Sequence, residues 1–136
     1  MAVERKLSDE LTDPYALRDG LLFLEKMQRL VSSQVPDTIY RDGEVPSNEN
    51  ISHYTLATIV ELIEMMNEMP WKKWSHTDRH NVAHTQRICD EFADVLAFIG
   101  ILLSYVRAFG VTPEKIAESY IKTSENNYKT LAKNKR

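Results

Sequence analysis

Two pairs of acidic residues with helical spacing are the feature of this sequence best suited to chemistry. Glu61 and Glu64 are three residues apart, and so are Glu91 and Asp94. On a helix, this spacing puts both carboxylates of a pair on one face. Either pair alone could be a solvated acidic surface, but both lie in apolar stretches, VELIEMM and CDEFADVLAF, that contain no lysine or arginine. We expect Asp94 to lie in a buried run, where acids rarely remain unpaired.

Two such helices packed antiparallel would bring four carboxylates together. Each like-charged pair at about 5 Å would cost about 3 kcal/mol at an effective dielectric constant near 20. Raised carboxyl pKa values could relieve this repulsion, but a divalent cation would neutralise the charge more effectively. A ligand set made only of oxygens favours Mg²⁺, or Mn²⁺ in its place, over zinc. A di-iron bundle would use Glu-x-x-His pairs, and the sequence contains none.

Four segments with helical periodicity would have to position these acids. We expect helices at about residues 13–35, 51–69, 78–108 and 112–132, which predicts an all-α bundle of four main helices. Proline in the first turn of the first and last segments, and Gly110 after the third, support these limits. Residues 13–132 would form one domain, with an N-terminal tail at 1–12 and a basic tail at 133–136.

The two middle helices should form the core of the bundle. The second carries an apolar stripe made of Leu56, Ile59, Val60, Ile63 and Met66. The centre of the third, FADVLAFIGILL, is apolar almost all round, as in a helix that packs on two partners at once. In so small a domain we expect the second partner to be another copy of the chain, which predicts a homodimer or tetramer.

Composition excludes several other classes of protein. The chain of 136 residues is 43% hydrophobic and 27% charged, which fits one soluble globular domain. A net charge of −3 gives no reason to expect a nucleic-acid partner. The longest mostly apolar run, residues 92–103, is shorter than the ~20 residues of a membrane span. Cys89 has no second cysteine for a disulfide, so we expect a reducing, cytoplasmic setting.

The acid pairs and the sequence around them resemble a known group of enzymes. Glu61-x-x-Glu64, followed by 26 residues and then Glu91-x-x-Asp94, looks like the all-α nucleoside triphosphate pyrophosphatase superfamily of MazG-like proteins and dimeric dUTPases. VELIEMMNEMPWKKW resembles the dimeric dUTPase pattern of a Glu-x-x-Glu helix, an Asn-Glu and a Trp-Lys-x-Trp turn. EFADVLAFIGILL and FGVTPEKIAESYIKTSENNYK resemble its second metal motif and its closing helix. The likeness covers roughly residues 51–130.

The resemblance implies Mg²⁺-dependent hydrolysis of a nucleoside triphosphate to a monophosphate and pyrophosphate. Glu61, Glu64, Glu91 and Asp94 would bind two or more Mg²⁺ ions, which would contact phosphate and activate a water. Glu61 or Glu64 would also orient this water or act as its base. The leading candidate substrate is dUTP, with dGTP, dATP and dCTP still open. Such an enzyme would control the nucleotide pool in bacteria or in phage-infected cells.

The resemblance also implies roles for residues outside the acid pairs. Phosphate contacts would come from Lys122, Asn127, Lys72 and Lys129, and base or sugar contacts from Gln28, Asn67, Trp71 and Trp74. Plain alternatives exist, such as surface lysines near a helix end and Trp74 as a hydrophobic clasp over the bundle. Gln28 matches the glutamine that reads uracil in dimeric dUTPases. Val31 and Ser32 stand where that family tends to have Asn or Asp, so the base stays open.

A non-catalytic helical dimerisation module, with its acids facing solvent, is the second hypothesis. It predicts no pyrophosphate release and equal thermal stability with and without Mg²⁺ and nucleotide. A nucleic-acid binder using the basic tail is disfavoured, because the sequence has no basic stripe.

Overall fold

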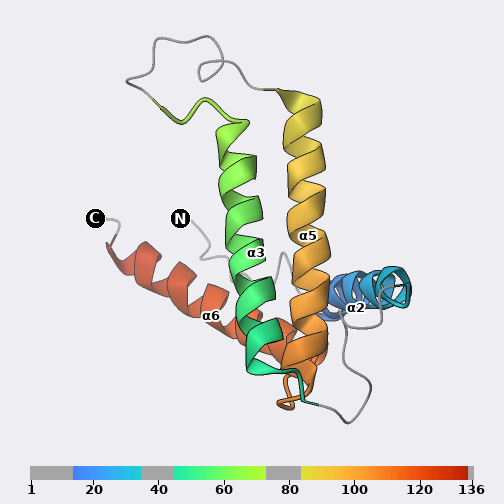
Figure 1. Ribbon diagram of the computed structural model, residues 1–136. Helices are drawn as coiled ribbons and strands as arrows, with labels where there is room; N and C mark the ends of the chain where they lie inside the picture. Colours follow the sequence, from blue (N-terminus) through green and yellow to red (C-terminus); the bar gives the residue numbers. More distant parts are fainter. Residues whose placement is uncertain (1–13, 35–44, 73–83, 135–136) are drawn as a thin grey trace.

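The computed structural model of the protein describes residues 14–34, 45–72 and 84–134. These residues form four helices and no strand: α2 (Pro14–Ser32), α3 (Asn48–Asn67), α5 (Thr85–Arg107) and α6 (Pro113–Asn134). The predicted all-α fold is confirmed. Helices α3 and α5 lie antiparallel and side by side, α2 packs across α5, and α6 packs against α2 and leads away from the α3–α5 pair (Figure 1).

A serine cap explains where α3 begins. The Ser47 hydroxyl oxygen accepts a hydrogen bond from the Asn50 backbone N–H at 3.1 Å, so the helix starts at Asn48, three residues earlier than expected. It ends at Asn67, ahead of the proline that cannot continue it. The expected start of the third helix near residue 78 lies outside the described residues.

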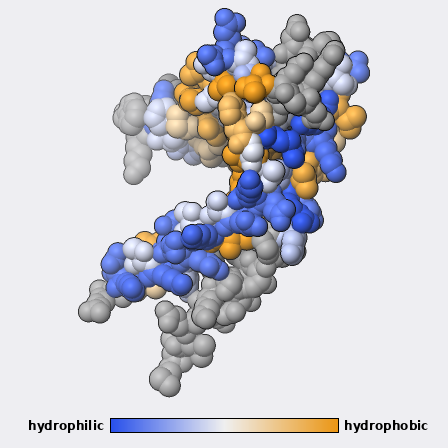
Figure 2. Space-filling model, turned by 90° about the horizontal axis from the view of Figure 1, so that it is seen from below, coloured by the Kyte–Doolittle hydropathy of each residue, from blue (hydrophilic) through white to orange (hydrophobic). Residues whose placement is uncertain are grey.

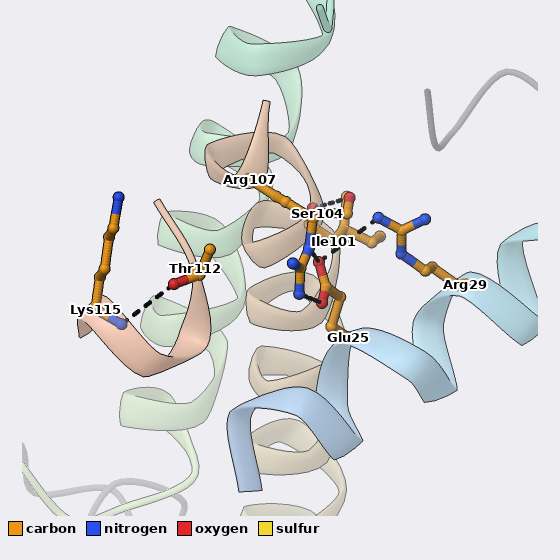
Figure 3. Close-up of polar contacts among 7 residues, drawn as sticks. All are labelled: Glu25, Arg29, Ile101, Ser104, Arg107, Thr112 and Lys115. Atoms are coloured by element: carbon orange, nitrogen blue, oxygen red, sulfur yellow. Dashed lines mark hydrogen bonds and ion pairs between the residues drawn. The ribbon is translucent and has the colours of Figure 1, made fainter. Parts of the chain in front are cut away.

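The turn between α5 and α6 follows the local sequence as predicted. Gly110 has a positive φ of 80°, the left-handed conformation that commonly ends a helix. Its N–H donates to the Arg107 carbonyl at 3.0 Å. Thr112 Oγ1 then accepts a hydrogen bond from the Lys115 backbone N–H at 3.3 Å and so caps α6 (Figure 3). Helix α6 continues to Asn134, two residues beyond the expected end.

Contacts at both ends of the α3–α5 pair fix its antiparallel register. At one end, the ring centroid of Tyr54 lies 6.2 Å from that of Phe98 and 5.8 Å from that of Tyr105. At the other end, the His84 backbone N–H donates to the Glu68 carbonyl at 3.4 Å. The two acid pairs lie between these contacts, so the register places them opposite each other.

A buried ion pair joins α2 to α5. Glu25, only 2% exposed, accepts hydrogen bonds from Nε of Arg107 at 2.9 Å and from Nη2 of the same guanidinium (Figure 3). Arg29 Nη2 lies 3.7 Å from the same carboxylate. Beside this pair, the fully buried Ser104 donates its hydroxyl hydrogen to the Ile101 carbonyl. The α2–α5 contact is therefore polar, with its central carboxylate held by charge-assisted hydrogen bonds.

The same contact needs a glycine on α5. A Cβ atom added at Gly100 would lie 2.5 Å from Gln28 Cγ and 2.6 Å from the Leu24 carbonyl oxygen. No real Cβ tolerates such distances, so only glycine allows α2 to approach α5 this closely. Gly100 thereby gives Gln28 its place against the α5 backbone.

The core of a single chain is small. Only Val95, Ile101, Leu103, Tyr105 and Ala117 are buried hydrophobic residues in the described part of the chain. The stripe expected to form the core face of α3 is instead solvent-exposed, with Leu56 60%, Ile59 47%, Val60 50% and Ile63 47% exposed. That expectation is wrong for one chain, because α3 packs against α5 along one side only. Apolar side chains also reach the surface in the view from below (Figure 2).

Burial along α5 changes at Val95. Phe92 is 48% exposed and Asp94 is exposed, whereas Val95 is only 3% exposed. The expected burial of Asp94 is therefore wrong, because it lies in the part of α5 that only α3 covers. None of the helices in the described ranges combines the length and apolar character needed to cross a membrane.

Candidate metal centre

Three of the four predicted acids come together between α3 and α5. Glu61, Glu64 and Glu91 each offer a carboxylate oxygen, and these oxygens all lie within 4.8 Å of one another. We call these three residues the acidic cluster. Asp94 is exposed and lies outside it, but its charge still contributes to raising the pKa of Glu61 and of Glu91. No basic residue in the described ranges forms an ion pair with any of the four acids.

Burial and mutual repulsion perturb the acidic cluster. Burial, followed by the charges of Glu64 and Asp94, raises the pKa of Glu61 from 4.5 to about 7. Burial and the charge of Glu64 also raise the pKa of Glu91. Charged forms are disfavoured at both positions, because each carboxylate loses water and faces other carboxylates.

The acidic cluster also contains unsatisfied oxygens. One oxygen, Oε2, of Glu61 and of Glu91 is shielded from solvent and has no hydrogen-bond partner in the described part of the protein. Buried acceptors without partners are costly, and a cation would satisfy both. A donor set of carboxylate oxygens alone fits Mg²⁺ or Mn²⁺ better than zinc, which favours nitrogen and sulfur.

The acidic cluster is open on one side. Glu61 and Glu91 are half-buried, whereas Glu64 is exposed. Open ligand positions on the Glu64 side suit Mg²⁺, which keeps several waters and completes its coordination with substrate phosphates. The arrangement can therefore hold a hard divalent cation and leave room for a polyphosphate.

Three further predicted residues meet where α3 ends. The Trp71 indole Nε1–H donates to Asn67 Oδ1 at 3.0 Å, and Lys72 Nζ lies 5.2 Å from the Trp71 ring centroid. Asn67 is one helical turn beyond Glu64, so this group adjoins the acidic cluster. Trp74 lies outside the described residues.

The remaining predicted residues lie elsewhere in the chain. Gln28 is half-buried on α2 against Gly100. Lys122, Asn127 and Lys129 are exposed on α6, which packs against α2 and leads away from the α3–α5 pair (Figure 1). The structure therefore does not bring these three residues next to the acidic cluster within one chain.

Sequence reasoning missed the residues that hold α2 in place. A glycine inside a helical pattern can mark a close backbone approach, so Gly100 carried a usable signal. Glu25 and Arg107 are 82 residues apart and show no local pattern that would pair them.

Comparison with known proteins gives a family. A family profile described as dUTPase matches residues 21–108, more than half of the chain, and the match includes all four acids. Together with the all-helical fold, this places the chain among the all-α nucleoside triphosphate pyrophosphatases of the MazG-like and dimeric dUTPase-like superfamily. Within that superfamily the chain belongs to the dUTPase family. Membership implies a nucleoside triphosphate hydrolase. No curated protein and no solved structure matches the chain.

Proposed function

We propose that the protein is a Mg²⁺-dependent pyrophosphohydrolase that cleaves a deoxynucleoside triphosphate between its α- and β-phosphates. The products would be a nucleoside monophosphate and pyrophosphate. The leading candidate substrate is dUTP, with dGTP, dATP and dCTP as further candidates. The convergence of Glu61, Glu64 and Glu91, with carboxylate oxygens within 4.8 Å of one another, is the observation that carries the proposal.

Each acid has a distinct part in this reaction. The acidic cluster and the neighbouring Asp94 would hold Mg²⁺, for which Mn²⁺ can substitute. Bound there, the ion would neutralise phosphate charge and activate the attacking water. Glu61 or Glu64 would orient that water and take up its proton. Exposure on the open side of the cluster favours Glu64 for this contact, and the half-buried Glu61 is better suited to anchor the ion.

Substrate contacts would come from two regions of the chain. Near the acidic cluster, Lys72 would bind phosphate, while Asn67 and Trp71, with Trp74, would contact the base or sugar. Gln28 would bind the base from α2. These positions suit a nucleotide lying along the α3–α5 pair with its triphosphate at the acidic cluster.

A second copy of the chain would complete the site. Lys122, Asn127 and Lys129 would contact phosphate from the α6 of a partner, because in one chain α6 leads away from the acidic cluster. The exposed apolar stripe of α3 supports association as a homodimer or tetramer, since large apolar patches commonly mark interfaces.

Pyrophosphate release from a panel of nucleotides tests the proposal. Purified protein with Mg²⁺ should release pyrophosphate from at least one of dUTP, dCTP, dGTP and dATP, and EDTA should stop the reaction. Glu64→Gln, which keeps the shape of the side chain, should abolish release. Glu118→Gln makes the same change at an exposed position on α6 and should leave it unchanged.

A non-catalytic dimerisation module is the second candidate, and the exposed apolar stripe of α3 favours it equally. The module predicts no pyrophosphate release and the same melting temperature with and without Mg²⁺ and nucleotide. Full activity of Glu64→Gln, or no release from any nucleotide, would contradict the proposed enzyme.

A further inference from the structure

A single hydrogen bond fixes the orientation of the Asn67 side chain at the end of α3. The Trp71 indole nitrogen lies 3.0 Å from Asn67 Oδ1. An indole N–H can only donate, so the atom facing it must be the amide oxygen. The amide NH₂ group of Asn67 therefore points away from Trp71. It has no hydrogen-bond partner within residues 14–34, 45–72 and 84–134, and Asn67 is exposed.

The position of Asn67 relates it to the open side of the acidic cluster. Three residues along a helix correspond to a rise of about 4.5 Å and a rotation of about 60°. The step from the half-buried Glu61 to the exposed Glu64 is one such rotation, and the step from Glu64 to Asn67 is another in the same sense. Asn67 thus lies next to Glu64, further round on the side from which a substrate would reach the metal.

The turn after α3 presents only hydrogen-bond donors beside Asn67. The Met69 N–H donates to the Met66 carbonyl at 3.0 Å, and the Trp71 N–H donates to the Met69 carbonyl at 2.9 Å, which folds the indole back over Asn67. The Lys72 ammonium, also a donor only, lies over the Trp71 ring. A ligand group bound to Asn67 must therefore be an acceptor.

A neutral oxygen suits this position better than a phosphate. The carboxyl end of a helix carries the negative end of its dipole, which disfavours anions. Glu68, the residue after Asn67, adds a further negative charge and is paired with Arg87 at 4.0 Å. In a nucleotide, the neutral acceptors that remain are the keto oxygens of the base.

We propose that Asn67, oriented by Trp71, selects a base with a keto oxygen over a base with an amino group at the same position. The inference rests on the proposed function and adds to it the residue that separates dUTP from dCTP. Uracil offers an acceptor where cytosine carries an amino donor. Facing cytosine, the Asn67 N–H would meet a second donor, and both would remain unpaired. Trp71 is a positioning residue in this scheme, because it keeps the amide from turning over.

Asn67→Asp is the sharpest test. Aspartate keeps an oxygen to accept from Trp71 and replaces the outward NH₂ with an acceptor. The ratio of kcat/KM for dUTP to that for dCTP should fall by about 10–100-fold. The added negative charge affects both triphosphates alike, so it cancels from the ratio. Asn48→Asp makes the same substitution at the exposed first residue of α3 and should leave the ratio unchanged.

Trp71→Phe separates orientation from contact. Phenylalanine keeps an aromatic ring but removes the N–H, so the Asn67 amide can turn over. The dUTP to dCTP ratio should then fall toward one while kcat for dUTP changes less than threefold. A merely structural role of Trp71 would lower kcat for both nucleotides and leave their ratio as it is.

Binding of the products gives a readout independent of turnover. Calorimetry with Mg²⁺ should show wild-type protein binding dUMP more tightly than dCMP, with the preference lost in Asn67→Asp. A wild-type preference for dCTP, or ratios in Asn67→Asp within twofold of wild type while its melting temperature is retained, would overturn the inference. Absence of pyrophosphate release from every nucleotide would contradict the proposed function instead, and the ratio of dUMP to dCMP binding would still decide the role of Asn67.

Discussion

Replacing Gly100 with alanine tests the close contact between α2 and α5 that places Gln28. The new Cβ would lie 2.6 Å from the Leu24 carbonyl oxygen, whereas ordinary van der Waals contact begins at 3.4 Å. Helix α2 would have to move by roughly 0.8 Å, because a backbone oxygen cannot rotate away as a side chain can. Overpacking of this kind costs up to about 3 kcal/mol. Alanine returns about 1 kcal/mol through its higher helix propensity, so Gly100→Ala should lose about 2 kcal/mol of unfolding free energy.

Gly20→Ala is the matched control for this substitution. Gly20 lies on α2, and a Cβ added there would meet nothing within 4 Å. Only the propensity effect then remains, and Gly20→Ala should gain about 0.5–1 kcal/mol. The same chemical change should therefore have opposite signs at the two glycines.

Urea denaturation followed by circular dichroism measures both effects. For a chain of this length, a loss of about 2 kcal/mol corresponds to a melting temperature lower by roughly 8 °C. Gly100→Ala should also weaken nucleotide binding, since Gln28 lies against this position. Equal stabilisation by the two alanines would refute the reasoning, because it would mean that α2 does not approach α5 at Gly100.

Three further predictions concern the ion pair, the cap of α3 and the acidic cluster. Arg107→Met should lower the unfolding free energy in urea by about 3 kcal/mol or more, because it leaves the buried Glu25 charge without its main partner; a Glu25→Met/Arg107→Met double variant no more stable than the single one would argue against this cause. Ser47→Ala should cost about 1 kcal/mol in the same assay, while Ser47→Asn, which can still cap, should cost little, and equal losses would count against the cap. The pKa of Glu61 is raised to about 7 by burial and by its neighbours, so between pH 4.5 and 7 the folded state keeps a proton that the unfolded state releases. Melting temperatures in EDTA should therefore fall over that range, Glu61→Gln should reduce the fall, and an identical profile in this variant would contradict the raised pKa.

Local patterns were enough to predict the helices and the meeting of the acids. Helical periodicity and capping residues act within a few positions, so the start of α2 and the stop at Gly110 follow from neighbouring residues. Helical spacing puts Glu61 and Glu64 on one face, and an antiparallel neighbour is enough to add Glu91. The acidic cluster could therefore be predicted without knowledge of the remaining fold.

Contacts between distant segments could not be predicted in this way. The pairing of Glu25 with Arg107 depends on the angle at which α2 crosses α5, and no local pattern encodes that angle. The apolar stripe of α3 has the period of a core face but stays exposed, because period alone does not say which chain covers it. The same reason explains Asp94, which lies in an apolar run and yet is exposed. Likewise, the residues of α6 cannot be placed from their spacing, since the direction of α6 is set by its packing on α2.

The central claim is that the acidic cluster binds a divalent cation, and anomalous diffraction from crystals grown with Mn²⁺ tests it most directly. The anomalous map should show a strong peak between α3 and α5, at bonding distance from carboxylate oxygens of Glu61, Glu64 and Glu91. Crystals of Glu61→Gln grown in the same way should lose most of this peak. A map of the wild-type protein without density there, with the three carboxylates turned apart into solvent, would contradict the claim.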